Sequence, residues 1–166
     1  GKVRHFGVSN QNPMMMELLK TAVKQPLKVN QLQLSAAFTP SFEAGFHVNM
    51  EGAKAAVRDG SVFEYCRLTD TVIQAWSVLQ HGYFKGNFVG KEEFAALNHV
   101  LNDLAKKYQV TPTAIALAWV LRYPGKMQAV IGTTKPQHVL EAGKAAAVTL
   151  TRKEWYQIYL AAGNDL

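Results

Sequence analysis

The feature that most constrains the fold of this chain is a regular alternation of strand-like and helix-like segments along its whole length. Short runs rich in β-branched and aromatic residues alternate with amphipathic or alanine-rich stretches, about four times at roughly 40 residues per unit. The expected strands are Arg4–Ser9, Val29–Leu34, Val72–Val78 and Met127–Ile131. Strands that alternate with helices in this order form a parallel sheet with the helices outside it.

The helical segments carry start signals at their N-termini. Asn12-Pro13 and Thr111-Pro112 each place a capping side chain before a proline, and Thr151 and Glu154 have the spacing of a capping box. The expected helices are Met14–Val23, Glu92–Tyr108, Thr113–Tyr123 and Pro136–Ala146, with a last helix that begins after Thr151.

Between Ser35 and Asp70 the pattern is looser. We expect a long connection there with short helical pieces, at Ala53–Val57 and at Phe63–Arg67. No low-complexity tract or linker divides the chain, which indicates one structural unit.

The length decides how much of a parallel architecture the chain can form. A doubly wound sheet and a (β/α)8 barrel both fit the order of elements, but a complete barrel takes about 250 residues. The chain has 166 residues, so four units would form half of such a barrel. Half a barrel leaves two bare sheet edges.

Composition excludes several other classes. With 48% apolar and 18% charged residues the chain is a globular domain, and no run approaches the ~20 apolar residues that span a bilayer. We therefore predict no membrane partner. The single cysteine, Cys66, cannot form a disulfide within the chain, which favours a reducing compartment and a cytoplasmic location.

The charge pattern favours small anionic ligands. The net charge of +6 is spread along the chain, and no basic cluster or aromatic-basic platform points to nucleic acid. The histidines lack metal-ligand spacing with Cys66 or with one another, so we predict no metal site.

In parallel α/β folds the ligand lies at the carboxyl ends of the strands. The residues there are Ser9-Asn10, Asn30-Gln31, Trp76-Ser77 and Gly132-Thr133-Thr134. They offer amides and hydroxyls for a carboxamide, one aromatic plane, and a turn at a helix N-terminus that suits phosphate. Ordinary turns, core packing and helix capping are the structural alternatives for the same residues. None of these groups is a convincing acid, base or nucleophile.

Five segments together resemble one known family. They are GKVRHFGVSN, VNQLQLS, IQAWSVL, AIALAWVLRYPGKMQAVIGTTKPQHV and LTRKEWYQIY, and they resemble the second half of an aldo-keto reductase. These enzymes are NAD(P)H-dependent carbonyl reductases on a (β/α)8 barrel. The resemblance implies that residues 1–166 are the C-terminal half of such a TIM barrel.

At the nicotinamide end, the resemblance implies roles for four residues. Ser9 and Asn10 would hold the nicotinamide carboxamide, Gln31 would join them from the next strand, and Trp76 would stack on the nicotinamide ring.

At the phosphate end, Ser77 and Leu79 would begin the loop that covers the pyrophosphate. Further residues would follow the turn toward the adenosine, namely Gly132, Thr133, Thr134, Lys135, His138 and Glu141.

Two departures from the family pattern limit the assignment. The family's catalytic aspartate, tyrosine, lysine and histidine come from earlier barrel strands and have no counterpart in the chain, so we expect no catalytic residues here. The position that commonly carries an arginine for the 2′-phosphate is His138. The choice between NADP and NAD therefore stays open, with Lys135 and the basic balance favouring NADP.

The resemblance implies an aldehyde or ketone as the substrate of the whole enzyme. The alternative is a catalytically silent nucleotide-binding or regulatory module of the same fold. On its own, the segment is expected to be inactive, and to need either a missing N-terminal half or a second copy to cover its edges.

Overall fold

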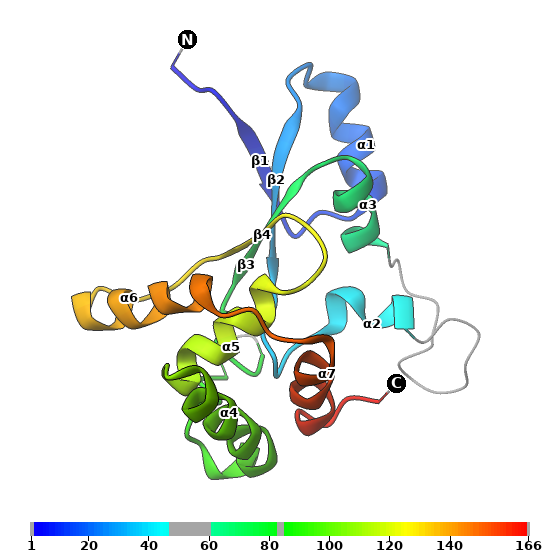
Figure 1. The fold of residues 1–166 in the computed structure, drawn as a ribbon. Coiled ribbons are helices and arrows are strands. Elements are labelled where there is room, and N and C mark those ends of the chain that lie inside the picture. Colours follow the sequence, from blue (N-terminus) through cyan, green and yellow to red (C-terminus); the bar gives the residue numbers. More distant parts are fainter. Residues whose placement is uncertain (1, 47–60, 83–84, 166) are drawn as a thin grey trace.

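A computed structural model describes residues 2–46, 61–82 and 85–165 (Figure 1). Its strands are β1 (Phe6–Ser9), β2 (Leu27–Gln33), β3 (Val72–Trp76) and β4 (Met127–Ala129). They form one sheet in the order β1-β2-β3-β4, and every neighbouring pair is parallel. This confirms the parallel α/β fold expected from the alternation.

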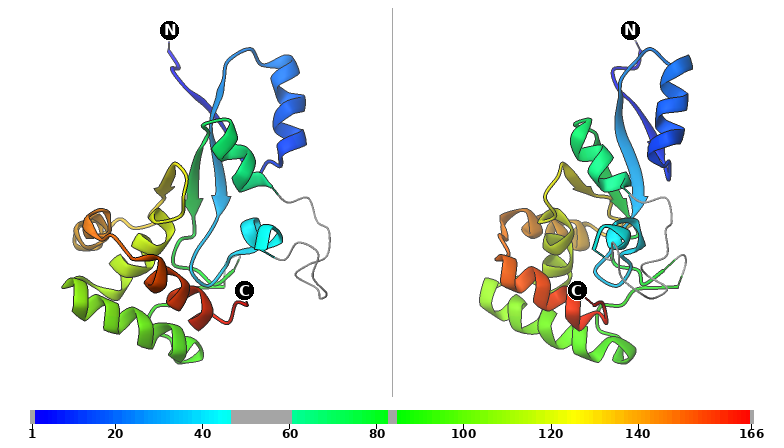
Figure 2. Two further views of the ribbon diagram at one scale, coloured as in Figure 1. Left: turned by 45° about the vertical axis from the view of Figure 1, so that its right-hand side comes forward. Right: turned by 90° about the vertical axis from the view of Figure 1, so that its right-hand side faces the viewer.

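The helices lie where the start signals predicted them, with one addition in the loose region. They are α1 (Pro13–Ala22), α2 (Pro40–Phe46), α3 (Val62–Leu68), α4 (Ala95–Tyr108), α5 (Pro112–Leu121), α6 (Pro136–Gly143) and α7 (Arg152–Ala161), and short 3-10 turns occupy Glu92–Phe94 and Lys144–Ala147. Helix α3 confirms the piece expected at Phe63–Arg67, whereas Ala53–Val57 falls outside the described residues. Helices α4, α5 and α7 pack together in one group (Figures 1 and 2).

The two faces of the sheet differ in burial. On β3, Ile73 and Ala75 are fully buried, whereas Gln74 between them is only partly buried. Because successive strand residues point to opposite faces, one face lies under the helices and the other lies open. The open face of the half-barrel corresponds to the interior of a closed one.

Glycine is required at one position in β1. A Cβ on Gly7 would stand 2.8 Å from the Cβ of Val29 on β2. The strand register shifts between Phe6 and Gly7, so the two backbones approach closely there.

The sequence caps form as predicted. The Asn12 side chain accepts from the Met15 amide at 2.8 Å, and the Thr111 hydroxyl accepts from the Ala114 amide at 3.2 Å. Thr151 and Glu154 form both halves of a capping box at the start of α7. Each cap satisfies amides that the first helical turn leaves unpaired.

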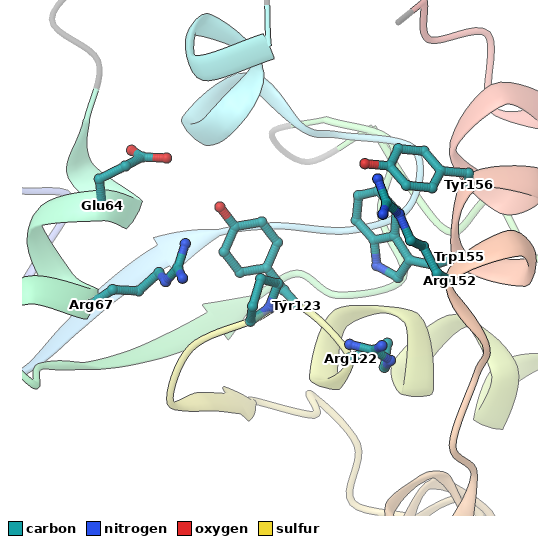
Figure 3. Close-up of a pocket in the computed structure, with 8 residues that line it drawn as sticks. Glu64, Arg67, Arg122, Tyr123, Arg152, Trp155 and Tyr156 are labelled. Carbon is teal, nitrogen blue, oxygen red and sulfur yellow. The ribbon is translucent and has the colours of Figure 1, made fainter.

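Helix α5 is the centre of the core, with Ala114 to Val120 all buried. Trp119 of this helix stacks on Trp155 of α7 with ring centroids 4.8 Å apart. Each indole Nε1 donates to the other residue's carbonyl oxygen at 3.1 Å. Trp155 and Tyr123 also line a pocket on the surface (Figure 3).

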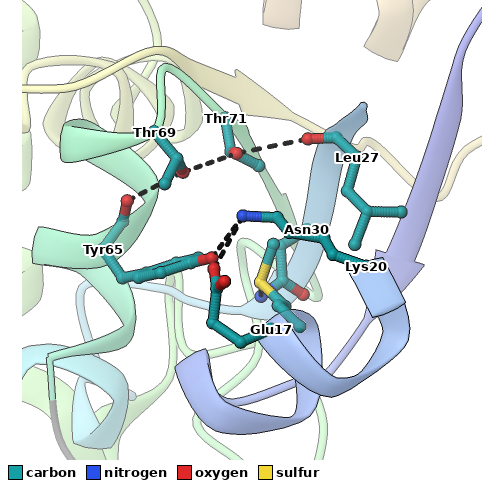
Figure 4. A network of polar contacts seen from close by, with 8 residues as sticks. Glu17, Lys20, Leu27, Asn30, Tyr65, Thr69 and Thr71 are labelled. Atoms are coloured by element: carbon teal, nitrogen blue, oxygen red, sulfur yellow. Dashed lines mark hydrogen bonds and ion pairs between the residues drawn. The ribbon is translucent and has the colours of Figure 1, made fainter. Parts of the chain in front are cut away.

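Helix α1 buries Pro13 and Met16 and also makes a polar contact with α3 (Figure 4). Lys20 Nζ donates to Glu17 at 2.7 Å and to the Tyr65 hydroxyl of α3 at 2.5 Å. Nearby, the Thr71 hydroxyl contacts Thr69 and donates to the Leu27 carbonyl at the start of β2. The outer face of α1 remains exposed and apolar, at Met14, Met15, Leu18 and Leu19.

Glu154 generates a prediction about stability. It is buried, which by itself would raise the pKa of its carboxyl, but hydrogen bonds from Lys107, Thr151 and Tyr108 outweigh burial and lower this pKa to about 2. The carboxylate therefore contributes stability above its ordinary pKa of 4.5, and this contribution is lost as the pH falls toward 2.

We expect Glu154→Gln to lower the free energy of unfolding by about 2 kcal/mol at pH 7. Chemical denaturation of the full-length protein that contains this chain measures the difference, which should shrink steadily from pH 4.5 to pH 2. A difference that does not change with pH would contradict the ionised capping box.

Candidate functional site

A cleft of about 660 Å³ opens at the carboxyl ends of β3 and β4. The end of β3, the loop after it, the first turns of α5 and the turn that leads into α6 form its walls. It contains seven residues that the sequence singled out, namely Trp76, Ser77, Leu79, Gly132, Thr133, His138 and Glu141. The structure therefore brings them together, and their roles remain predictions.

The chain turns sharply where two strands end. Asn10 after β1 has φ 54° and Ser77 after β3 has φ 52°, both in the left-handed region. The turn at Ser77 ends β3 at Trp76, two residues before the expected strand end at Val78. The Asn10 amide donates to the Gln31 carbonyl at 2.9 Å, and the Trp76 indole Nε1 donates to Asn10 Oδ1 at 3.4 Å. Asn10 thus links the end of β1 to β2 and β3.

Ser9 and Gln31 lie outside the main cleft, in a shallow hollow of about 440 Å³ on the open face of the sheet. The Ser9 hydroxyl donates to the Gln31 carbonyl at 3.2 Å. Gln31 Nε2 donates to Gln74 at 3.4 Å, and Gln74 Nε2 donates to Gln128 at 2.9 Å. These three glutamines, the glutamine ladder, are paired in the strand register.

The turn from β4 into α6 is organised by Thr133. Its hydroxyl accepts from the Lys135 amide at 3.2 Å and lies 3.4 Å from His138 Nδ1. No atom lies within 4 Å of the point where a Cβ on Gly132 would stand, so this glycine leaves the cleft wall free. Thr134 is exposed and does not line the cleft.

Sequence reasoning missed several residues of the site. Gln80, Asn87 and Thr113 line the cleft, and Gln74 and Gln128 join Gln31 on the open face. The sequence did carry a signal for the glutamine ladder. Polar and apolar residues alternate in NQLQ (residues 30–33) and IQAW (residues 73–76), which places Gln31 and Gln74 on one face of their strands.

The described residues offer no group of three or more histidine, cysteine or acidic side chains that could hold a metal ion. Cys66 is buried, and burial raises the pKa of its thiol to about 11, so it stays protonated. Over the part of the chain that the structure describes, no helix is long and apolar enough to cross a membrane.

Comparison with known proteins agrees with this geometry. Residues 1–161 match the sequence model of the aldo/keto reductase family. The chain belongs to this family of oxidoreductases. A 6-dehydroglucose reductase of Agrobacterium fabrum (strain C58) is 33% identical over 168 residues, which cover 100% of this chain and 49% of that protein.

Solved aldo-keto reductases share the fold. The thermostable aldo-keto reductase Tm1743, in a complex with the inhibitor epalrestat, superposes with a TM-score of 0.67 and 21% identity over 95% of this chain and 48% of that one. The aldo-keto reductase AKR2E5, solved with NADPH, gives a TM-score of 0.65 and 17% identity over 95% and 42% of the two chains. The chain thus spans about half the length of its relatives, as expected for half of a (β/α)8 barrel.

The left-handed turn of this aldo-keto reductase chain at Asn10 generates a second prediction. Asn10→Gly keeps the backbone conformation and removes the side chain whose oxygen Trp76 contacts, whereas Asn10→Ala removes the same contact and also strains the backbone. We expect the free energy of unfolding to be about 1 kcal/mol lower for the alanine variant than for the glycine variant. Urea denaturation of both variants tests this, and equal stabilities would show that the turn does not constrain residue 10.

Proposed function

We propose that this chain is the cofactor-binding C-terminal half of an enzyme that transfers a hydride between NADPH and an aldehyde or ketone. The observation that carries the proposal is the cleft at the carboxyl ends of the strands. It joins an aromatic plane, Trp76, to Gly132 and Thr133 in the turn that precedes α6, within one cavity of about 660 Å³. Such a cavity is large enough for an extended nucleotide.

The groups at the nicotinamide end fit a carboxamide. The glutamine ladder runs in one direction, because Gln31 donates to Gln74 and Gln74 donates to Gln128. This order leaves the Gln31 side-chain oxygen as an acceptor for a carboxamide NH2 group, and Ser9 and Asn10 would complete the recognition. Trp76, held by Asn10, would set the plane of the ring.

The groups at the other end fit phosphate and ribose. The turn from Gly132 to Lys135 precedes the first turn of α6, where unpaired amides and the helix dipole favour negative charge. Thr133 and Thr134 add hydroxyl donors, and Ser77 and Leu79 would cover the pyrophosphate from the loop after β3. His138 and Glu141 of α6 would lie along the adenosine.

The nicotinamide supplies the hydride when it is bound, and the chain's own residues bind it and choose the face that it presents. Trp76 would block one face of the ring, so the carbonyl substrate would approach the other. Proton transfer to the carbonyl oxygen needs a positioned acid. In the proposed enzyme that acid comes from the earlier barrel strands, which the chain lacks.

A catalytically silent nucleotide-binding module of the same fold is the second candidate, because the described residues that line the cleft carry only two titratable side chains, His138 and Glu141, and both belong to α6 and not to the strand end that carries Trp76. One comparison separates the two. The full-length protein should oxidise NADPH when a simple aldehyde is added if it is a reductase, and it should bind NADPH without turnover if it is a silent module.

The stacking role of Trp76 predicts a change in fluorescence. NADPH should quench tryptophan emission of the full-length protein, and Trp76→Ala should remove most of this quench and weaken NADPH binding by about 1–3 kcal/mol, the usual magnitude for stacking on an aromatic side chain. Trp76→Phe is the matched control, because it retains a ring and should keep part of the affinity. An undiminished quench in Trp76→Ala would exclude stacking.

Cofactor choice gives a further prediction at His138. If this side chain faces the 2′-phosphate, His138→Arg should tighten NADPH binding about tenfold relative to NADH, because a planar guanidinium forms paired charge-assisted bonds to phosphate. Gln137→Arg adds the same charge at the neighbouring position and serves as the control. Equal changes for the two cofactors, measured by titration, would show that residue 138 points elsewhere.

A further inference from the structure

A second pocket lies outside the cleft proposed for the cofactor, which we call the cofactor cleft, among the helices that cover the sheet. It has a volume of about 320 Å³ and lies between the C-terminal ends of α3 and α5 and the first turns of α7 (Figure 3). Pro124 in its wall stands just before β4, and Arg67 stands just before β3. One wall of the pocket therefore lies near the amino ends of these strands, and the pocket shares no lining residue with the cofactor cleft.

The charge of the pocket is strongly unbalanced. Three arginines line it, each from a different helix end, namely Arg67, Arg122 and Arg152. One carboxylate, Glu64, lines the same pocket, so the summed formal charge is positive. Among the described residues, no carboxylate forms an ion pair with any of the three guanidinium groups. The carboxylate of Asp70 close by is paired with Lys126 at 2.5 Å.

Each arginine is instead positioned by an uncharged group. Arg122 Nε donates to the Leu150 carbonyl at 2.9 Å, so an uncharged acceptor holds this guanidinium. The Arg152 guanidinium lies 5.7 Å from the centre of the Tyr156 ring, and the Arg67 side chain points toward Tyr123 (Figure 3). Contacts of this kind fix the direction of a guanidinium without neutralising its charge.

The remaining wall of the pocket is aromatic and firmly packed. Tyr123 and Trp155 are buried, and both belong to the core, where Trp155 stacks on Trp119. Burial first, and then the charge of Glu64, raise the pKa of Tyr123 to about 12, so its hydroxyl remains a neutral donor. A ligand would therefore meet a rigid apolar surface beside several cationic and neutral donors.

We propose that this pocket, which we call the arginine pocket, binds a small organic anion: a phosphate or carboxylate group held by Arg67 and Arg152, with a flat apolar part against Trp155. Guanidinium groups match both oxyanions in geometry, and a cavity of this volume is at the small end of ligand sites. The two sites share no lining residue, so an anion in the arginine pocket would not compete with NADPH.

Calorimetric titration of the full-length protein with phenyl phosphate tests the proposal. We expect saturable binding that Arg67→Gln combined with Arg152→Gln weakens about tenfold or more, because both charge-assisted contacts are lost. Lys153→Gln removes the same charge from an exposed position on α7 outside the pocket and should leave the affinity nearly unchanged. Lys135→Gln, beside the expected nucleotide turn, should also have little effect if the probe binds in the arginine pocket.

Further probes separate the parts of the ligand. Inorganic phosphate and benzoate distinguish the two anions, and binding of either supports the site, whereas phenol should not bind. Arg152→Lys keeps the charge and loses the planar donor pair, so it should bind less tightly than the native protein. No saturable heat with any anion, binding of phenol alone, or equal losses in Lys153→Gln and the double variant would each overturn the proposal.

Retained NADPH binding in the double variant would show that these losses are local and that the fold is intact. If NADPH failed to bind even to the native protein, the proposed function would fail while the anion titration still decided the arginine pocket.

Discussion

The parallel alignment of the four strands is the constraint on which the rest of this structure depends. Parallel strands bring all their carboxyl ends to one edge of the sheet, so residues far apart in sequence become neighbours there. Asn10 and Trp76 are 66 positions apart, yet their side chains meet. Antiparallel pairing of any one strand would send its end to the other edge and separate it from the cleft.

The same alignment explains why one face of the sheet is bare. Helices cover only the outer face, and the inner face of a closed barrel is filled by side chains from all of its strands. Here that face carries the glutamine ladder, and the edges keep apolar residues exposed, namely Phe6 at the start of β1 and Val130 after β4, at 39% and 38%. These surfaces are what a further set of βα units would cover, in keeping with a chain that spans about half the length of its relatives.

The fold was largely predictable because its signals are local. The cap at Asn12-Pro13 and the apolar spacing of α4 each depend on a few neighbouring residues. The glutamine ladder and the arginine pocket could not be derived in this way, because both depend on strand register and on how helix ends meet. The end of β3 was also predicted incorrectly from local sequence. Residues typical of a strand continue to Val78, but the left-handed backbone at Ser77 ends the strand at Trp76.

Charge illustrates the difference between composition and placement. The net charge of +6 suggested anionic ligands, yet the described residues that line the proposed cofactor cleft include no lysine or arginine, and they include Glu141. Three arginines instead gather in the arginine pocket, namely Arg67, Arg122 and Arg152. A whole-chain charge therefore cannot choose between NADP and NAD. In the proposed function that choice would depend on local donors around the turn into α6, where the Thr133 hydroxyl lies 3.4 Å from His138 Nδ1.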